Sequence, residues 1–233
     1  MAASLVLKPG TARDVHGQRT AVAVVSLGIL ALAAILEIWR TVPTELGQGL
    51  FRFDQTALAA ERLALLGGLI LILMSWSTAP KANLGEYYGC LLIIIGAIPV
   101  VGASNDLVSL FLGLELISIP TYIMLGISKG DNAGSEATIK YFLLSAFASC
   151  FFLLGVSYLY GFSGSTNLQV IQSSYASGGR LVSFAVVLVM CGLAFRITAV
   201  PFHFYAPDVF EGTSLTLAGI MSYLPKVAGF VAL

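Results

Sequence analysis

Long uninterrupted apolar runs constrain this chain more than any other feature of its sequence. Each run is close to the roughly 20 residues that a helix needs to cross a bilayer. In lipid only helices and closed barrels satisfy all their backbone groups, and continuous rather than alternating apolar runs disfavour barrel strands. The sequence therefore predicts an all-α, polytopic transmembrane helix bundle with seven spans, at about 21–39, 57–76, 87–103, 106–127, 136–160, 181–199 and 213–233.

Composition excludes several classes of protein. Of the 233 residues, 58% are hydrophobic and 10% are charged, whereas soluble domains usually carry about 25% charged residues. The net charge is zero, so no basic surface suggests a nucleic-acid partner. Cys90, Cys150 and Cys191 lie in apolar runs without a CxxC motif, so we interpret them as core residues rather than metal ligands or a disulfide. We expect a lipid environment and no metal site.

The chain divides into three parts. Residues 1–20 are polar and lack a cleavage motif, so we do not interpret them as a removable signal peptide. Residues 21–85 contain two leading spans with their loops, and residues 86–233 contain the remaining five. Gly, Ser and Tyr are frequent in 161–180, which predicts a surface loop.

Charged residues inside spans are costly, and each one is a functional hypothesis. Glu115 lies in the middle of its span, and Lys140 lies near the start of the next. Lys140 can be an interfacial lysine whose stem reaches the membrane surface. Alternatively, Lys140 pairs with Glu115 across adjacent helices, so that each pKa depends on the charge of the partner, as a proton relay requires.

A broken helix is predicted near residues 196–208. Arg196 ends an apolar run, and Pro201 and Pro207 follow it. Broken helices at membrane depth occur where backbone lines a cavity or is buried in protein. His203 lies within the break, where it can transfer protons near neutral pH or act as a hydrogen-bonded buried histidine at a helix end.

Lys226 lies in the middle of the last span, directly after Pro225. A lysine so far from either membrane surface is not explained by an interfacial position, and a buried lysine can exchange protons. The predicted proton-translocation residues are Glu115, Lys140, Arg196, His203 and Lys226, and the predicted helix breaks are Pro120, Pro201, Pro207 and Pro225.

Four motifs occur in order: GLELISIPTY (113–122), EATIKYF (136–142), VPFHFYAPDVFEG (200–212) and LPKVAGFVAL (224–233). Together they resemble subunit N among the antiporter-like membrane subunits of bacterial proton-pumping NADH-quinone oxidoreductase, respiratory complex I. Such subunits contain inverted repeats of five helices. The resemblance implies that 86–233 is the first repeat. It also implies a fragment that lacks one helix before residue 21 and the second half.

The resemblance assigns the family's membrane glutamate to Glu115 and its lysines to Lys140 and Lys226. Arg196 stands where a further family lysine is expected. Arginine keeps its proton, so Arg196 cannot pass one on. We hypothesise that it supplies a fixed positive charge that tunes Glu115 or Lys226, while water or His203 carries the proton.

The resemblance also implies partners and a location. The chain would be a subunit of a proton-translocating enzyme in the inner (plasma) membrane of a bacterium, together with other membrane subunits. It has no cysteine cluster for iron–sulfur ligation and no Gly-rich dinucleotide motif, so no catalytic residue is assigned. NADH, FMN, iron–sulfur clusters and quinone are expected in partner subunits. A cation/proton antiporter subunit of the Mrp type and a non-translocating scaffold remain alternatives.

Overall fold

The computed structural model describes residues 12–39, 44–47, 49–80, 83–128, 132–174 and 179–233. Among these residues, seven helices are long and apolar enough to cross a membrane, which confirms the predicted helix bundle. They are α1 (Ala12–Ile38), α2 (Gln55–Ser75), α3 (Leu84–Ala103), α4 (Leu107–Ser128), α5 (Asn132–Ser163), α7 (Gly179–Arg196) and α9 (Leu215–Ala232).

The short elements were not predicted. Strands β1 (Thr44–Leu46) and β2 (Phe51–Phe53) form an antiparallel hairpin between α1 and α2. A short helix, α6 (Leu168–Ser174), lies within the stretch that was predicted to be a surface loop. Helix α1 also begins at Ala12, within the segment that we treated as a separate polar part of the chain.

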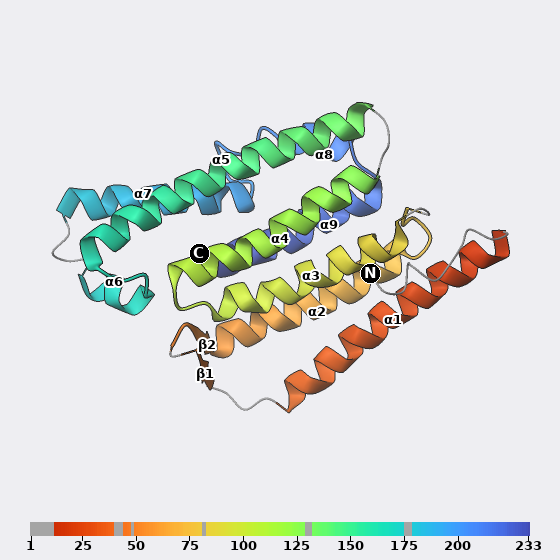
Figure 1. Ribbon diagram of the computed structural model, residues 1–233, viewed down its shortest axis with the longest axis horizontal. Helices are drawn as coiled ribbons and strands as arrows, with labels where there is room; N and C mark the ends of the chain where they lie inside the picture. The colour runs from red at the N-terminus through yellow and green to blue at the C-terminus, as the bar shows by residue number, and fades with distance from the viewer. Residues whose placement is uncertain (1–11, 40–43, 48, 81–82, 129–131, 175–178) are drawn as a thin grey trace.

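Helix α9 lies inside the bundle although it is the last helix of this sequence. Figure 1 shows α2, α3 and α4 side by side, with α9 behind α4 and with α5 and α7 running together beyond them. Helix α9 contacts α2, α3, α4 and α7, whereas α1 packs on the outer side against α2 and α3. The fold therefore places Lys226 among several neighbouring helices.

Glycine allows two of these helix contacts. A Cβ atom on Gly67 of α2 would overlap the ring of Tyr223 in α9. A Cβ atom on Gly155 of α5 would lie 2.7 Å from the backbone oxygen of Ala185 in α7. Close approach through small residues is a usual way for helices to associate in membranes.

The predicted broken helix is present. Helix α7 ends at Arg196, a turn containing Pro201 follows, and α8 (Ala206–Glu211) begins with Pro207 in its first turn. The breaks predicted at Pro120 and Pro225 were wrong, because α4 and α9 continue through these residues. A proline removes one backbone hydrogen bond, and packing against neighbouring helices can hold the rest of such a helix together.

Candidate functional site

An ion pair joins α7 to α4 inside the bundle. Nη2 of Arg196 lies 2.6 Å from Oε1 of Glu115. The side chain of Arg196 is only 7% exposed and that of Glu115 is 22% exposed. A charge removed from water in this way requires an opposite charge and further hydrogen bonds nearby.

Three serines supply these additional hydrogen bonds. Arg196 donates to the hydroxyl oxygens of Ser118 in α4 and of Ser145 and Ser149 in α5. Ser149 in turn donates to Glu115 over 2.7 Å, and Tyr122 donates to Ser145 over 2.6 Å. The guanidinium therefore fixes three helices around one positive charge, which we call the arginine centre (Glu115, Ser118, Ser145, Ser149 and Arg196).

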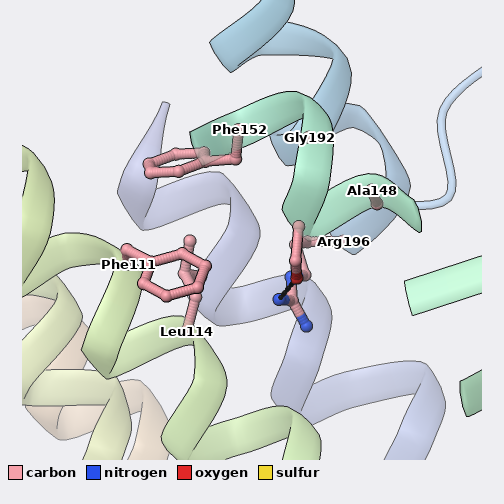
Figure 2. Close-up of a pocket in the computed structure, with 7 residues that line it drawn as sticks. Phe111, Leu114, Ala148, Phe152, Gly192 and Arg196 are labelled. Carbon is pink, nitrogen blue, oxygen red and sulfur yellow. Dashed lines mark hydrogen bonds between the residues drawn. The ribbon is translucent and has the colours of Figure 1, made fainter. Parts of the chain in front are cut away.

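A small pocket lies beside the arginine centre. Figure 2 shows Phe111 and Phe152 on one side of it and the guanidinium of Arg196 on the other. The two phenyl rings stack with their centroids 5.9 Å apart. Gly192 allows α7 to approach α5 here, because a Cβ atom would lie 2.7 Å from Cβ of Phe152. The arginine centre thus has an apolar wall that limits contact with water.

Lys140 does not pair with Glu115, so the predicted pair was wrong. Its Nζ atom lies 2.7 Å from Oδ2 of Asp208 in α8 and 2.7 Å from Oε1 of Glu136 in its own helix. The side chain is 41% exposed. Ser149, which does contact Glu115, lies nine residues further along α5, or about 13 Å at 1.5 Å per residue. That separation explains why Lys140 meets α8 instead.

Lys226 is half-buried in α9. Its Nζ atom donates to the backbone oxygen of Met221 over 3.2 Å and lies 5.5 Å from the ring centroid of Phe210 in α8. Within about 6 Å, an ammonium group over an aromatic face is attracted by the ring. No carboxylate within ion-pair distance of Lys226 is found among the residues that the structure describes.

His203 lies exposed in the turn between α7 and α8. Its alternative interpretation as a buried histidine at a helix end was therefore wrong. The hypothesis that His203 transfers protons stays a prediction.

The serines of the arginine centre and the α8 residues Asp208 and Phe210 were not predicted from the sequence. One signal was available for the serines. Ser118 follows Glu115 by about one helical turn, and Ser145 and Ser149 are spaced four residues apart, so each pair lies on one helix face. Polar residues at this spacing within apolar spans indicate an internal polar contact.

Comparison with known proteins assigns the family. Residues 104–233 match the family model described as NADH:quinone oxidoreductase/Mrp antiporter, TM. The chain belongs to this family. Subunit N of NADH-quinone oxidoreductase from Anoxybacillus flavithermus is 34% identical over 210 residues, which cover 87% of this chain and 42% of that protein. Subunit 2 of the NAD(P)H-quinone oxidoreductase of Prochlorococcus marinus is 41% identical over 186 residues, covering 78% and 36%.

Solved structures agree with this family assignment. A chain of respiratory complex I from Thermus thermophilus matches with a TM-score of 0.79 and 29% identity, over 92% of this chain and 47% of that chain. A chain of the Mrp complex from Dietzia sp. shares the fold, with a TM-score of 0.77 and 21% identity over 91% and 42%. This member of the NADH:quinone oxidoreductase/Mrp antiporter family thus spans less than half the length of the relatives that it matches.

Proposed function

We propose that this chain acts as a proton-translocating membrane subunit of an NADH-quinone oxidoreductase. The buried Glu115–Arg196 ion pair carries the proposal, because a bundle that serves only as a scaffold gains little from it. Replacing a buried ion pair by apolar side chains of similar volume is often neutral or stabilising. The high similarity to subunits named for NADH-quinone oxidoreductases supports this function over the Mrp-type alternative, for which the structural match shows the fold alone.

The geometry suggests how charge changes would be linked. Arg196 keeps its proton, so it holds a constant positive charge next to Glu115. A Cβ atom on Gly229 of α9 would lie 3.1 Å from Cβ of Arg196, so α9 meets α7 one turn from Lys226. At an effective dielectric constant near 20, a unit charge is worth about 4 kcal/mol at ~4 Å and about 1 kcal/mol at ~13 Å, the distance along α5 between Lys140 and the residue that contacts Glu115. Protonation of Glu115 would therefore change the electrostatic environment of neighbouring titratable groups, and Lys226 and Lys140 would take up and release protons.

The remaining parts of the reaction would lie in partner subunits. NADH, FMN, iron–sulfur clusters and quinone would be bound there, and this chain would contribute to the translocase without a redox centre. Residues 86–233 would form a five-helix repeat of the antiporter-like domain, beside other membrane subunits in the inner membrane of a bacterium.

The test is a Lys226→Met substitution, which removes the charge and keeps a similar apolar stem. Inverted membrane vesicles from the host would be followed for NADH oxidation and NADH-driven proton uptake together, with assembly checked on a native gel. We expect both rates to fall in an assembled complex. Arg180→Met is the matched control, since Arg180 is exposed at the start of α7 and its loss should leave both rates unchanged.

Unchanged rates in Lys226→Met vesicles would contradict the proposal. Normal NADH-driven uptake together with impaired sodium/proton exchange would instead favour an antiporter subunit. Normal values of both would favour a scaffold, in which the buried charges only fix helix packing.

A further inference from the structure

The short helix α8 contacts both lysines of the candidate site. Lys140 in α5 and Lys226 in α9 belong to different helices, and none of the described interactions joins them directly. Asp208 and Phe210 of α8 contact one lysine each. Figure 1 shows α8 beside the N-terminal half of α5, near the start of α9.

On one side, α8 is attached to α5 by charge and by close packing. Asp208 forms the 2.7 Å ion pair with Lys140. Gly212, which ends α8, lies directly against the first turns of α5, because a Cβ atom there would be 2.6 Å from Cβ of Ala137 and 2.8 Å from the oxygen of Ala133. The position of α8 therefore depends on α5 at two points.

Opposite its contact with α5, α8 contacts the ammonium of Lys226 through the ring of Phe210. Among the residues that the structure describes, two groups contact this ammonium: the ring of Phe210 and the backbone oxygen of Met221. The Met221 oxygen belongs to α9 itself, so Phe210 is the contact that reaches Lys226 from outside its own helix. A displacement of α8 would move the ring away from the ammonium.

We propose that α8 is a positioning element that links Lys140 to Lys226, so that the Lys140–Asp208 ion pair sets the position of Phe210 over Lys226. When this ion pair forms or breaks, α8 moves and changes the position of Phe210 over Lys226. The two lysines need no direct contact. Asp208 and Phe210 are positioning residues, because each acts through a lysine. The inference rests on the proposed function of Lys226 in proton translocation.

The experiment is a double-mutant cycle in the intact complex in host membranes. Asp208→Asn breaks the ion pair and Phe210→Leu removes the aromatic face while keeping an apolar side chain. We expect each single change to lower the rate of NADH-driven proton uptake by about threefold or more. The double variant should be no worse than the stronger single variant within about twofold, because both changes act on the same link.

Conservative variants separate positioning from a merely structural effect. Phe210→Tyr retains the aromatic face and Asp208→Glu retains the charge, so both should restore most of the uptake. Glu211→Gln is the matched control, since it removes a charge from an exposed position of the same helix and should change nothing. Lys140→Gln breaks the ion pair from α5 and also removes a proposed proton carrier, so it should lower uptake at least as much as Asp208→Asn. Adding Phe210→Leu to Lys140→Gln should cause no further loss, which keeps the test valid if Asp208→Asn fails to assemble.

Three outcomes would overturn the inference while leaving the proposed function intact. The first is normal uptake in Phe210→Leu beside impaired uptake in Lys226→Met. The second is multiplication of the two single effects in the double variant, which would place the residues on separate paths. The third is a Phe210→Tyr variant as impaired as Phe210→Leu. Normal uptake in Lys226→Met would instead contradict the proposed function itself.

Discussion

The ammonium of Lys226 donates a hydrogen bond to the backbone oxygen of Met221, which lacks its usual helical donor because residue 225 is a proline. In a regular helix the oxygen of Met221 would accept a hydrogen bond from the N–H group of residue 225, four positions later. Proline has no N–H group, and Nζ of Lys226 donates to this oxygen over 3.2 Å instead. The adjacent proline and lysine therefore form one structural unit, in which Pro225 leaves a backbone oxygen without its helical donor and Lys226 donates to that oxygen.

Substitution of Pro225 by alanine tests this relationship. Alanine restores the N–H group, which then competes with Lys226 for the oxygen of Met221. Alanine is also more favourable than proline in a helix interior by about 3 kcal/mol, so stability should rise. We expect a more thermostable complex that nevertheless shows several-fold lower NADH-driven proton uptake, measured in inverted vesicles and by thermal inactivation.

Pro99 provides the matched control for this substitution. It also lies inside a membrane-spanning helix, α3, and no lysine follows it. Pro99→Ala should stabilise the complex without loss of proton uptake. Unchanged uptake in Pro225→Ala would show that the contact with Met221 is dispensable.

A second prediction concerns the start of α2, outside the spans. Asp54 caps this helix by accepting hydrogen bonds from the backbone of Thr56 and Ala57, each over 3.0 Å, and from the hydroxyl of Thr56. These hydrogen bonds, that of the Thr56 hydroxyl foremost, lower the pKa of Asp54 below its usual value near 3.8. The charged form therefore stabilises the helix fully above about pH 4, and this stabilisation is lost as the pH falls through the lowered pKa.

Asp54→Ala should accordingly lower stability at pH 7 by roughly 0.5–2 kcal/mol, the usual cost of losing an N-cap. The difference from the unsubstituted chain should shrink at pH 3, where the carboxyl gains its proton. Asp54→Asn keeps a capping oxygen and should stay near the unsubstituted chain at pH 7. Thermal midpoints of the detergent-solubilised chain at both pH values would check this, and a difference that grows at low pH would contradict it.

The sequence was sufficient for the spans because a single requirement governs them. A bilayer-spanning helix must be long and apolar, and this property is visible in each segment by itself. The break after Arg196 was predictable for a similar local reason, since two prolines follow it closely. Pro120 and Pro225 show where this reasoning fails, because packing against neighbouring helices decides whether a helix continues past a proline.

The partners of the charged residues depended on which helix faces meet, and a single sequence does not give this information. Glu115 pairs with Arg196, which is 81 positions away, and Lys140 pairs with Asp208, which is 68 positions away. Neighbouring spans suggested a Glu115–Lys140 pair, but the two residues lie at different depths of their helices. The axial position of a charge along its helix was therefore the information that the prediction lacked.

A third prediction concerns the close packing of α5 against α7. A Cβ atom on Gly155 would lie 2.7 Å from a backbone oxygen of α7 and 2.8 Å from a backbone nitrogen, and backbone cannot yield as a flexible side chain can. Gly155→Ala should therefore separate the two helices and lower stability by roughly 1–3 kcal/mol, as overpacking usually does. Displacement of α7 would also disturb Arg196, so proton uptake should fall together with thermal stability.

Gly161 is the control for this substitution within the same helix. A Cβ atom there would have no neighbour within 4 Å, so Gly161→Ala should stabilise α5 by up to about 1 kcal/mol. Equal effects of the two substitutions on the thermal midpoint would show that the approach of α7 to Gly155 does not limit stability.

The last prediction concerns the charge and the shape of Arg196. Arg196→Ala leaves Glu115 with Ser149 as a hydrogen-bond donor but without a positive partner at 2.6 Å. Loss of one partner of a buried ion pair typically costs about 3–5 kcal/mol, so we expect poor assembly and little proton uptake. Arg196→Lys keeps the positive charge but presents a single nitrogen, which cannot reach all the serines as the two guanidinium nitrogens do.

Arg196→Lys should therefore assemble and show intermediate proton uptake. Ser118→Ala and Ser145→Ala, which remove hydrogen-bond acceptors while the ion pair remains, separate the contribution of geometry from that of charge. If geometry matters, these serine variants should resemble Arg196→Lys more closely than Arg196→Ala. The rate of NADH-driven proton uptake, measured together with assembly on a native gel, distinguishes these outcomes. Normal uptake in both Arg196→Lys and Arg196→Ala would rule out a fixed positive charge as a requirement for translocation.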